Sequence, residues 1–116
     1  MEENRFGPDV SIDRPAYIDP TARLFGKISV AEGASLWPYV VARAEMHAVH
    51  IGRFSNIQDH VVLHVGGGGP TIIGDYCSIT HHAVLHSATI GDNSLIGINV
   101  TLMDGVVIGE NCIVAG

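Results

Sequence analysis

An aliphatic residue recurs every six residues along most of the chain, apart from short slips. The series consists of Ile18, Leu24, Val30, Leu36, Ala42, Ile51, Ile57, Leu63, Ile73, Ile79, Leu85, Ile90, Ile96, Leu102, Ile108 and Val114. Four residues after each, the chain mostly places a small or β-branched side chain, such as Ala22, Val61 or Cys77. Helical spacing does not fit this pattern, whereas period six with β-branched residues is typical of a hexapeptide parallel β-helix.

Each hexapeptide supplies one short strand and one bend, and three of them complete a triangular coil. The aliphatic residues point inwards, and strands of stacked coils should lie roughly 4.8 Å apart. Because no coil buries its own face, stability comes from stacking. The pattern therefore predicts a single all-β domain over residues 1–116, shaped as a triangular prism, with an N-terminal cap at 1–17 and hexapeptide coils at 18–116.

Two insertions interrupt the repeat, one near residues 47–50 and one at residues 65–71. Both are expected to bulge outwards as loops, because extra residues cannot enter a stacked wall. The second reads VGGGGPT, with no Lys-Ser/Thr after it and no helical pattern behind it. We therefore interpret it as a flexible loop and not as a phosphate-binding loop.

Composition narrows the class of protein. The chain of 116 residues is 47% hydrophobic with only 6% aromatic residues, which suits a thin prism with an aliphatic core. A net charge of −6 and the lack of a basic cluster argue against nucleic acid or an anionic membrane as partners. The polar N-terminus carries no signal peptide or membrane-spanning run, so we expect a cytoplasmic location.

Both cysteines, Cys77 and Cys112, fall at the small inward position, two coils apart. Two coils separate the backbones by roughly 9.6 Å, and a disulfide needs Cα atoms within about 7 Å. We expect two free, reduced core cysteines rather than a catalytic thiol, which would need an exposed electropositive setting.

The register places His64 and His86 directly above one another. Leu63 and Leu85 are equivalent inward residues of successive coils, so the residues after them share an outward column, with Arg43 one coil below. Two imidazoles with backbones about 4.8 Å apart can direct their nitrogens to one metal at about 2.0–2.1 Å. The pair is a candidate metal site.

His81 belongs to a different column, with Asp59 one coil below it and Gln58 beside Asp59. It lies round a corner from His86, across five residues of chain that can span up to roughly 16 Å. One subunit therefore cannot easily bring all three histidines to one metal. Three subunits packed side by side can, which predicts a homotrimer with interfacial sites.

Several segments resemble the gamma-class carbonic anhydrase family of hexapeptide-repeat, left-handed β-helix proteins. They are ARAE at 42–45, SNIQD at 55–59, LHV at 63–65 and THHAVLHSATIG at 80–91, and the resemblance covers about residues 10–116. It implies a left-handed helix, where the general rule for parallel crossovers would favour the right-handed form. The C-terminal capping helix of that family has no counterpart in this sequence.

The resemblance implies a divalent metal bound by His64, His81 and His86, two from one subunit and one from its neighbour. Zinc is the expected ion, with iron or cobalt as alternatives. The activity implied is reversible hydration of carbon dioxide to bicarbonate by a metal-bound hydroxide.

Five further residues gain roles from the resemblance. Those implied to be catalytic are Gln58, which would orient water or bicarbonate, and Asp59. Those implied to support the interface and the site are Arg43, Glu45 and Asn56.

Two departures from the family pattern bear on the rate of reaction. The chain has Ala44-Glu45 where the family commonly has Gly-Asp, and the glycine loop offers no counterpart to an acidic loop whose glutamate shuttles protons.

Two alternatives stay open: an acyl-coenzyme A acyltransferase or thioesterase on the same scaffold, and a non-catalytic trimeric metal-binding or assembly protein. The remaining histidines are interpreted as solvated surface residues; they are His47, His50, His60 and His82.

Overall fold

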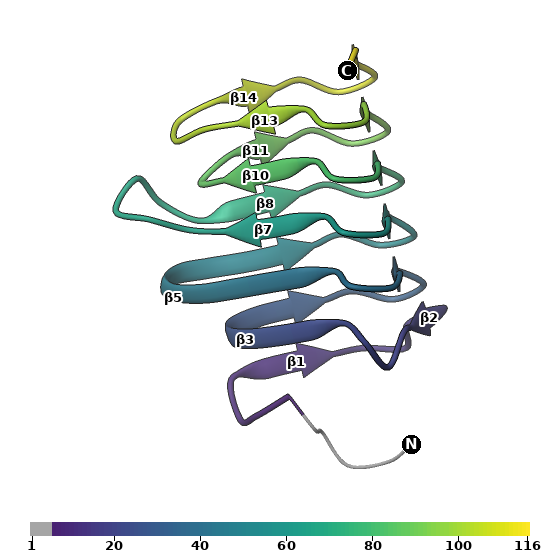
Figure 1. The fold of residues 1–116 in the computed structure, drawn as a ribbon, viewed down its shortest axis with the longest axis vertical. Coiled ribbons are helices and arrows are strands. Elements are labelled where there is room, and N and C mark those ends of the chain that lie inside the picture. The colour runs from purple at the N-terminus through teal and green to yellow at the C-terminus, as the bar shows by residue number, and fades with distance from the viewer. Residues whose placement is uncertain (1–5) are drawn as a thin grey trace.

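The computed structural model describes residues 6–116, which form a β-solenoid of parallel strands without a helix (Figure 1). The coils stack from the N-terminal end at the bottom of the view to the C-terminal end at the top. No helix that could span a membrane occurs among these residues. The cytoplasmic location stays a prediction.

Three flat faces make up the solenoid, and each is a ladder of parallel strands. The first face contains the starts of β3 (Arg23–Val30) and β5 (Val41–Ile51), then β7 (Val62–His64), β10 (Val84–His86) and β13 (Thr101–Leu102). The second contains β1 (Val10–Ile12), the ends of β3 and β5, β8 (Thr71–Ile73), β11 (Thr89–Ile90) and β14 (Val107–Ile108). The third contains β2 (Tyr17–Ile18), β4 (Ser35–Leu36), β6 (Asn56–Ile57), β9 (Ser78–Ile79), β12 (Leu95–Ile96) and β15 (Ile113–Val114).

The hexapeptide residues form the core in the register that the sequence predicts. On the first face the inward column is Leu24, Ala42, Leu63, Leu85 and Leu102, each buried. On the third face Leu36, Ile57, Ile79 and Ile96 are fully buried. The predicted all-β parallel β-helix with hexapeptide repeats is therefore confirmed.

The coils begin earlier than the predicted boundary at residue 18. Strand β1 pairs with β3, and Val10 is buried in the core. Ile12 lies six residues before Ile18 and continues the hexapeptide series, which explains the extension. Residues 1–5 of the predicted cap lie outside the described part of the chain.

The first insertion is not the loop that we expected. Strand β5 continues through residues 41–51 and curves round the edge between the first and second faces (Figure 1). It pairs with β3 at residues 41–44 and 49–51, whereas residues 45–48 have no partner in β3, whose register shifts between Gly26 and Ile28. The extra residues therefore form a bulge within a continuous strand and not a separate loop. The second insertion does form an outward loop between β7 and β8, as predicted.

Two corners of the solenoid carry columns of residues in the left-handed backbone region, where Asn and His are enriched. One corner consists of Tyr39, His60, His82 and Asn99, with φ between 63° and 64°. The rings of His60 and His82 stack at 4.9 Å and 3° and stay exposed to solvent. These two histidines therefore lie on a corner, away from the column of His64 and His86.

Both cysteines are free, as expected. Cys77 is fully buried, and burial raises the pKa of its thiol, so it is a poor nucleophile. Cys112 is half-buried and not a core residue, because no described coil lies above β15.

We predict that Gly52→Ala destabilises the solenoid. An added Cβ would lie 2.3 Å from the carbonyl oxygen of Gly74 in the next coil and 2.4 Å from its carbonyl carbon. Because both are backbone atoms held by the ladder, overpacking should lower the free energy of unfolding by about 1–3 kcal/mol in a urea titration. Gly67→Ala is the control, since a Cβ there meets nothing within 4 Å. Equal stability of the two variants would contradict the stacking account.

Candidate metal centre

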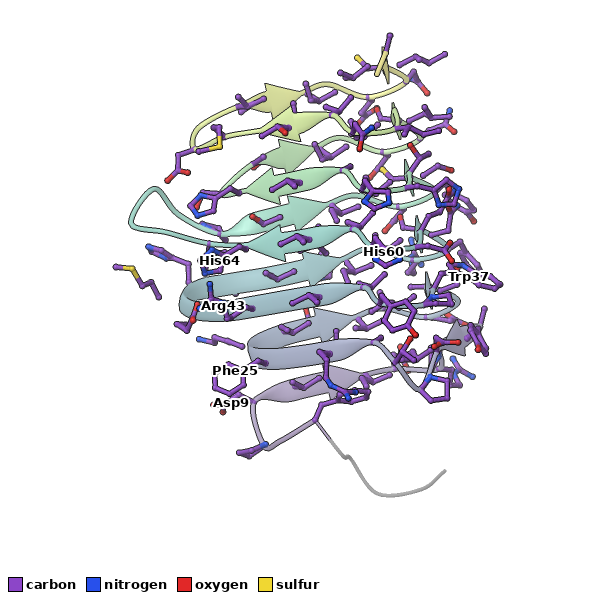
Figure 2. The ribbon with its side chains drawn as sticks, viewed as in Figure 1. Asp9, Phe25, Trp37, Arg43, His60 and His64 are labelled. Carbon is purple, nitrogen blue, oxygen red and sulfur yellow. The ribbon has the colours of Figure 1, made fainter. Side chains whose placement is uncertain are left out.

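The strand register aligns Arg43, His64 and His86 on the outer side of the first face. The imidazole centroids of His64 and His86 lie 4.9 Å apart, and the rings are inclined at 73°. Their side chains are 24% and 25% exposed, so both are reachable from solvent while their packing is constrained. Figure 2 shows Phe25, Arg43 and His64 rising along the same edge of the stack. The predicted column is therefore present.

Glu45 connects Arg43 to His64. One carboxylate oxygen accepts a hydrogen bond from Arg43 Nη1 at 2.8 Å, and the other lies 2.9 Å from His64 Nε2. The hydrogen bond with His64, followed by a backbone hydrogen bond and the charge of Arg43, holds the pKa of Glu45 below its usual value. Glu45 is therefore ionised at neutral pH. Glutamate is longer than the aspartate common at this position in the family, and here its carboxylate reaches both Arg43 and His64.

A second carboxylate meets the other histidine. Asp104 lies in the turn that follows β13, and its Oδ1 is 2.5 Å from His86 Nδ1. Sequence reasoning missed this residue, although a signal was there. Met103 follows the inward residue Leu102 and so continues the histidine column one coil above His86, and Asp104 is the next residue along the chain.

The other predicted residues gather on the third face. A groove of about 420 Å³ is lined by Ser35, Trp37, Asn56, Gln58, Asp59 and His81. His81 Nδ1 lies 3.4 Å from Asp59 Oδ1, and both side chains are nearly half exposed. Figure 2 places Trp37 at the edge of the stack opposite His64. The structure thus divides the predicted site into two groups on different faces.

The amide of Gln58 is held in place by its neighbours. Its Nε2 donates to Asn56 Oδ1 at 2.8 Å, and Asn56 Nδ2 donates in turn to Ser78 Oγ at 3.0 Å. The indole of Trp37 packs against Tyr17 with centroids 5.0 Å apart and donates to Ser35 Oγ at 3.1 Å. The groove therefore has an aromatic wall and an ordered amide beside His81.

Within residues 6–116, no three His, Cys, Asp or Glu side chains are grouped closely enough to hold a metal ion. The column of His64 and His86 supplies two imidazoles that suit a borderline divalent ion such as zinc. The donor types fit such a metal, but this donor set is incomplete without a third ligand from elsewhere.

Comparison with known proteins supports the hexapeptide repeat. Residues 87–116 match the family described as bacterial transferase hexapeptide (six repeats). The fold superposes with a TM-score of 0.79 on the crystal structure of a hexapeptide transferase family protein from Anaplasma phagocytophilum, at 28% identity over 92% of this chain and 74% of that one. Both findings agree with the hexapeptide-repeat β-solenoid described above.

Sequence relatives narrow the resemblance further. The chain is 38% identical to gamma carbonic anhydrase 1, mitochondrial, of Arabidopsis thaliana, over 97% of this chain and 43% of that protein. It is 37% identical to the carnitine operon protein CaiE of Escherichia coli, over 86% of this chain and 51% of that protein. The resemblance to gamma carbonic anhydrases is confirmed, and this hexapeptide-repeat chain spans about half the length of these relatives or less.

Proposed function

We propose that this chain forms a metal-dependent, gamma-type carbonic anhydrase that hydrates carbon dioxide reversibly to bicarbonate. The observation that carries the proposal is the pair of stacked imidazoles on β7 and β10, in a chain similar over nearly its whole length to a protein named gamma carbonic anhydrase. The residues that would hold the metal are His64 and His86 of one subunit and His81 of a neighbour. When bound, a divalent ion such as zinc, iron or cobalt supplies a hydroxide nucleophile at neutral pH.

A homotrimer would complete the site, and the first face suits burial against a second copy. Beside the Arg43 and histidine column runs a parallel outward row of Val41, Val62 and Val84. Such an apolar row gains free energy when another subunit covers it. The groove beside His81 would then face the neighbour's histidine column.

The remaining residues would orient the reactants. Gln58, held by Asn56, would place its amide where water or bicarbonate binds, and Asp59 would anchor His81. The hydrogen bonds that link Arg43 to Glu45 and Glu45 to His64 would restrain the His64 ring.

A second candidate is acyl transfer on the same scaffold, which the likeness to a hexapeptide transferase family protein favours. Fold alone does not assign activity. A non-catalytic trimeric metal-binding protein is the third candidate. If activity returns only when metal is restored to metal-free protein, the carbonic anhydrase is favoured over acyl transfer. Measurable hydration of carbon dioxide separates the carbonic anhydrase from the non-catalytic protein.

We predict that His86→Ala and His81→Ala each abolish tight zinc binding, because each removes one of three ligands. Mixing the two variants should restore some binding, since a mixed interface can join intact His64 and His86 of one chain to intact His81 of another. Zinc titration against a chromophoric chelator measures this. His82→Ala, which removes an exposed corner imidazole, is the matched control and should bind normally. No recovery after verified subunit exchange would count against a shared site.

We also predict that hydration is limited by proton transfer. The loop at 65–71 contains no acid or base, and Glu45, with its lowered pKa, is a weak proton acceptor near neutral pH. Stopped-flow assays should therefore show kcat rising with added imidazole buffer, while kcat/KM stays nearly unchanged. A fast rate that ignores buffer would reveal an internal proton carrier. No hydration in metal-loaded protein at any buffer concentration would favour the non-catalytic alternative.

A further inference from the structure

We propose that Asp104 is a positioning residue that holds His86 ready to bind metal through Nε2. This inference rests on the proposed function and deepens it by adding a residue that the sequence did not single out. Its basis is the short contact between His86 Nδ1 and Asp104 Oδ1, at 2.5 Å.

The contact determines which nitrogen of His86 is available. In the arrangement that we propose, Asp104 Oδ1 accepts this hydrogen bond, so Nδ1 of His86 carries the proton. Nε2 of a neutral ring then keeps its lone pair for a metal. A carboxylate bound to the far nitrogen of a ligating histidine orients the ring and raises its basicity as a ligand.

The backbone fixes Asp104 over His86. The next residue, Gly105, has φ +83° and donates its N–H to the carbonyl oxygen of Ser87 at 3.0 Å. Ser87 directly follows His86, and its own N–H donates to the carbonyl of His64 at 3.2 Å. The turn that carries the carboxylate is therefore tied to the coil that carries the imidazole.

The glycine loop packs against the same pair. A Cβ at Gly66 would lie 2.8 Å from His86 Cε1, and a Cβ at Gly68 would lie 2.5 Å from Asp104 Oδ2. Ser87 Oγ anchors the loop, accepting from the Gly66 N–H at 3.0 Å and donating to the Gly69 carbonyl at 2.8 Å. The loop thus covers the Asp104–His86 contact, and glycine at 66 keeps the edge of the ring next to Nε2 uncrowded.

His64 is held differently, because its Nε2 is the atom that faces Glu45. Nε2 of His86 has no hydrogen-bond partner among the described residues. Of the two histidines in the column, His86 is therefore the one whose Nε2 is already free to bind a metal, and Asp104 holds the ring in that orientation.

The test compares Asp104→Ala with Glu110→Ala in the full chain. Both remove one carboxylate, but Glu110 lies in the turn between β14 and β15, at another corner. Zinc affinity, measured by competition with a chelator, should fall about 10- to 100-fold in Asp104→Ala and stay within about twofold of wild type in Glu110→Ala. Asp104→Asn keeps an acceptor oxygen and should retain most of the zinc affinity. This variant separates loss of the hydrogen bond from a general folding defect.

A second readout needs no metal. In the metal-free protein, nitrogen NMR of His86 should show the Nδ1–H tautomer, and Asp104→Ala should shift it towards Nε2–H. Unchanged zinc affinity and an unchanged tautomer in Asp104→Ala would overturn the positioning role, while wild-type zinc binding would leave the proposed function standing. Wild-type protein that binds no zinc would overturn the proposed function and this inference with it.

Discussion

Parallel stacking of coils is the constraint on which the rest of this structure depends. Each strand pairs with the equivalent strand of the next coil, and the inward aliphatic column on each face stays in register. A slip of one residue would turn the aliphatic side chains outwards, so the register is strongly specified. The same register that aligns Leu63 with Leu85 inside the prism aligns His64 with His86 outside it.

Stacking also explains why the candidate site is divided. A triangular prism directs its three faces away from one another, so the histidine column of the first face and His81 of the third cannot converge within one chain. What a single chain offers is two half-sites. One has two imidazoles with a carboxylate at each, and the other has one imidazole beside an ordered amide and an aromatic wall. Side-by-side association of identical prisms is the simplest way to join them.

Period six was enough to predict the coils, the columns and the separation of the histidines, because each depends only on counting residues in a repeat. Details that depend on local backbone geometry were not accessible in this way. Strand β5 accommodates an insertion as a bulge at residues 45–48, which have no partner in the shorter β3, and β1 extends the coils to Val10. Neither feature follows from the hexapeptide series taken from Ile18 onwards.

The carboxylates show the same limit at the site. The sequence placed Glu45 near the column, but its bridge between Arg43 and His64 depends on side-chain reach. Asp104 comes from a turn one coil above His86, and only three-dimensional proximity shows that the two meet. The glycine run was interpreted as a flexible loop, yet its glycines pack against this pair because side chains there would collide with it.

The proposed metal site exists only between subunits, and native mass spectrometry of zinc-loaded protein can test this. A shared site predicts a trimer that carries three zinc ions, and monomers released by dilution that carry none. A zinc-bound monomer, or a trimer that retains no zinc, would contradict it.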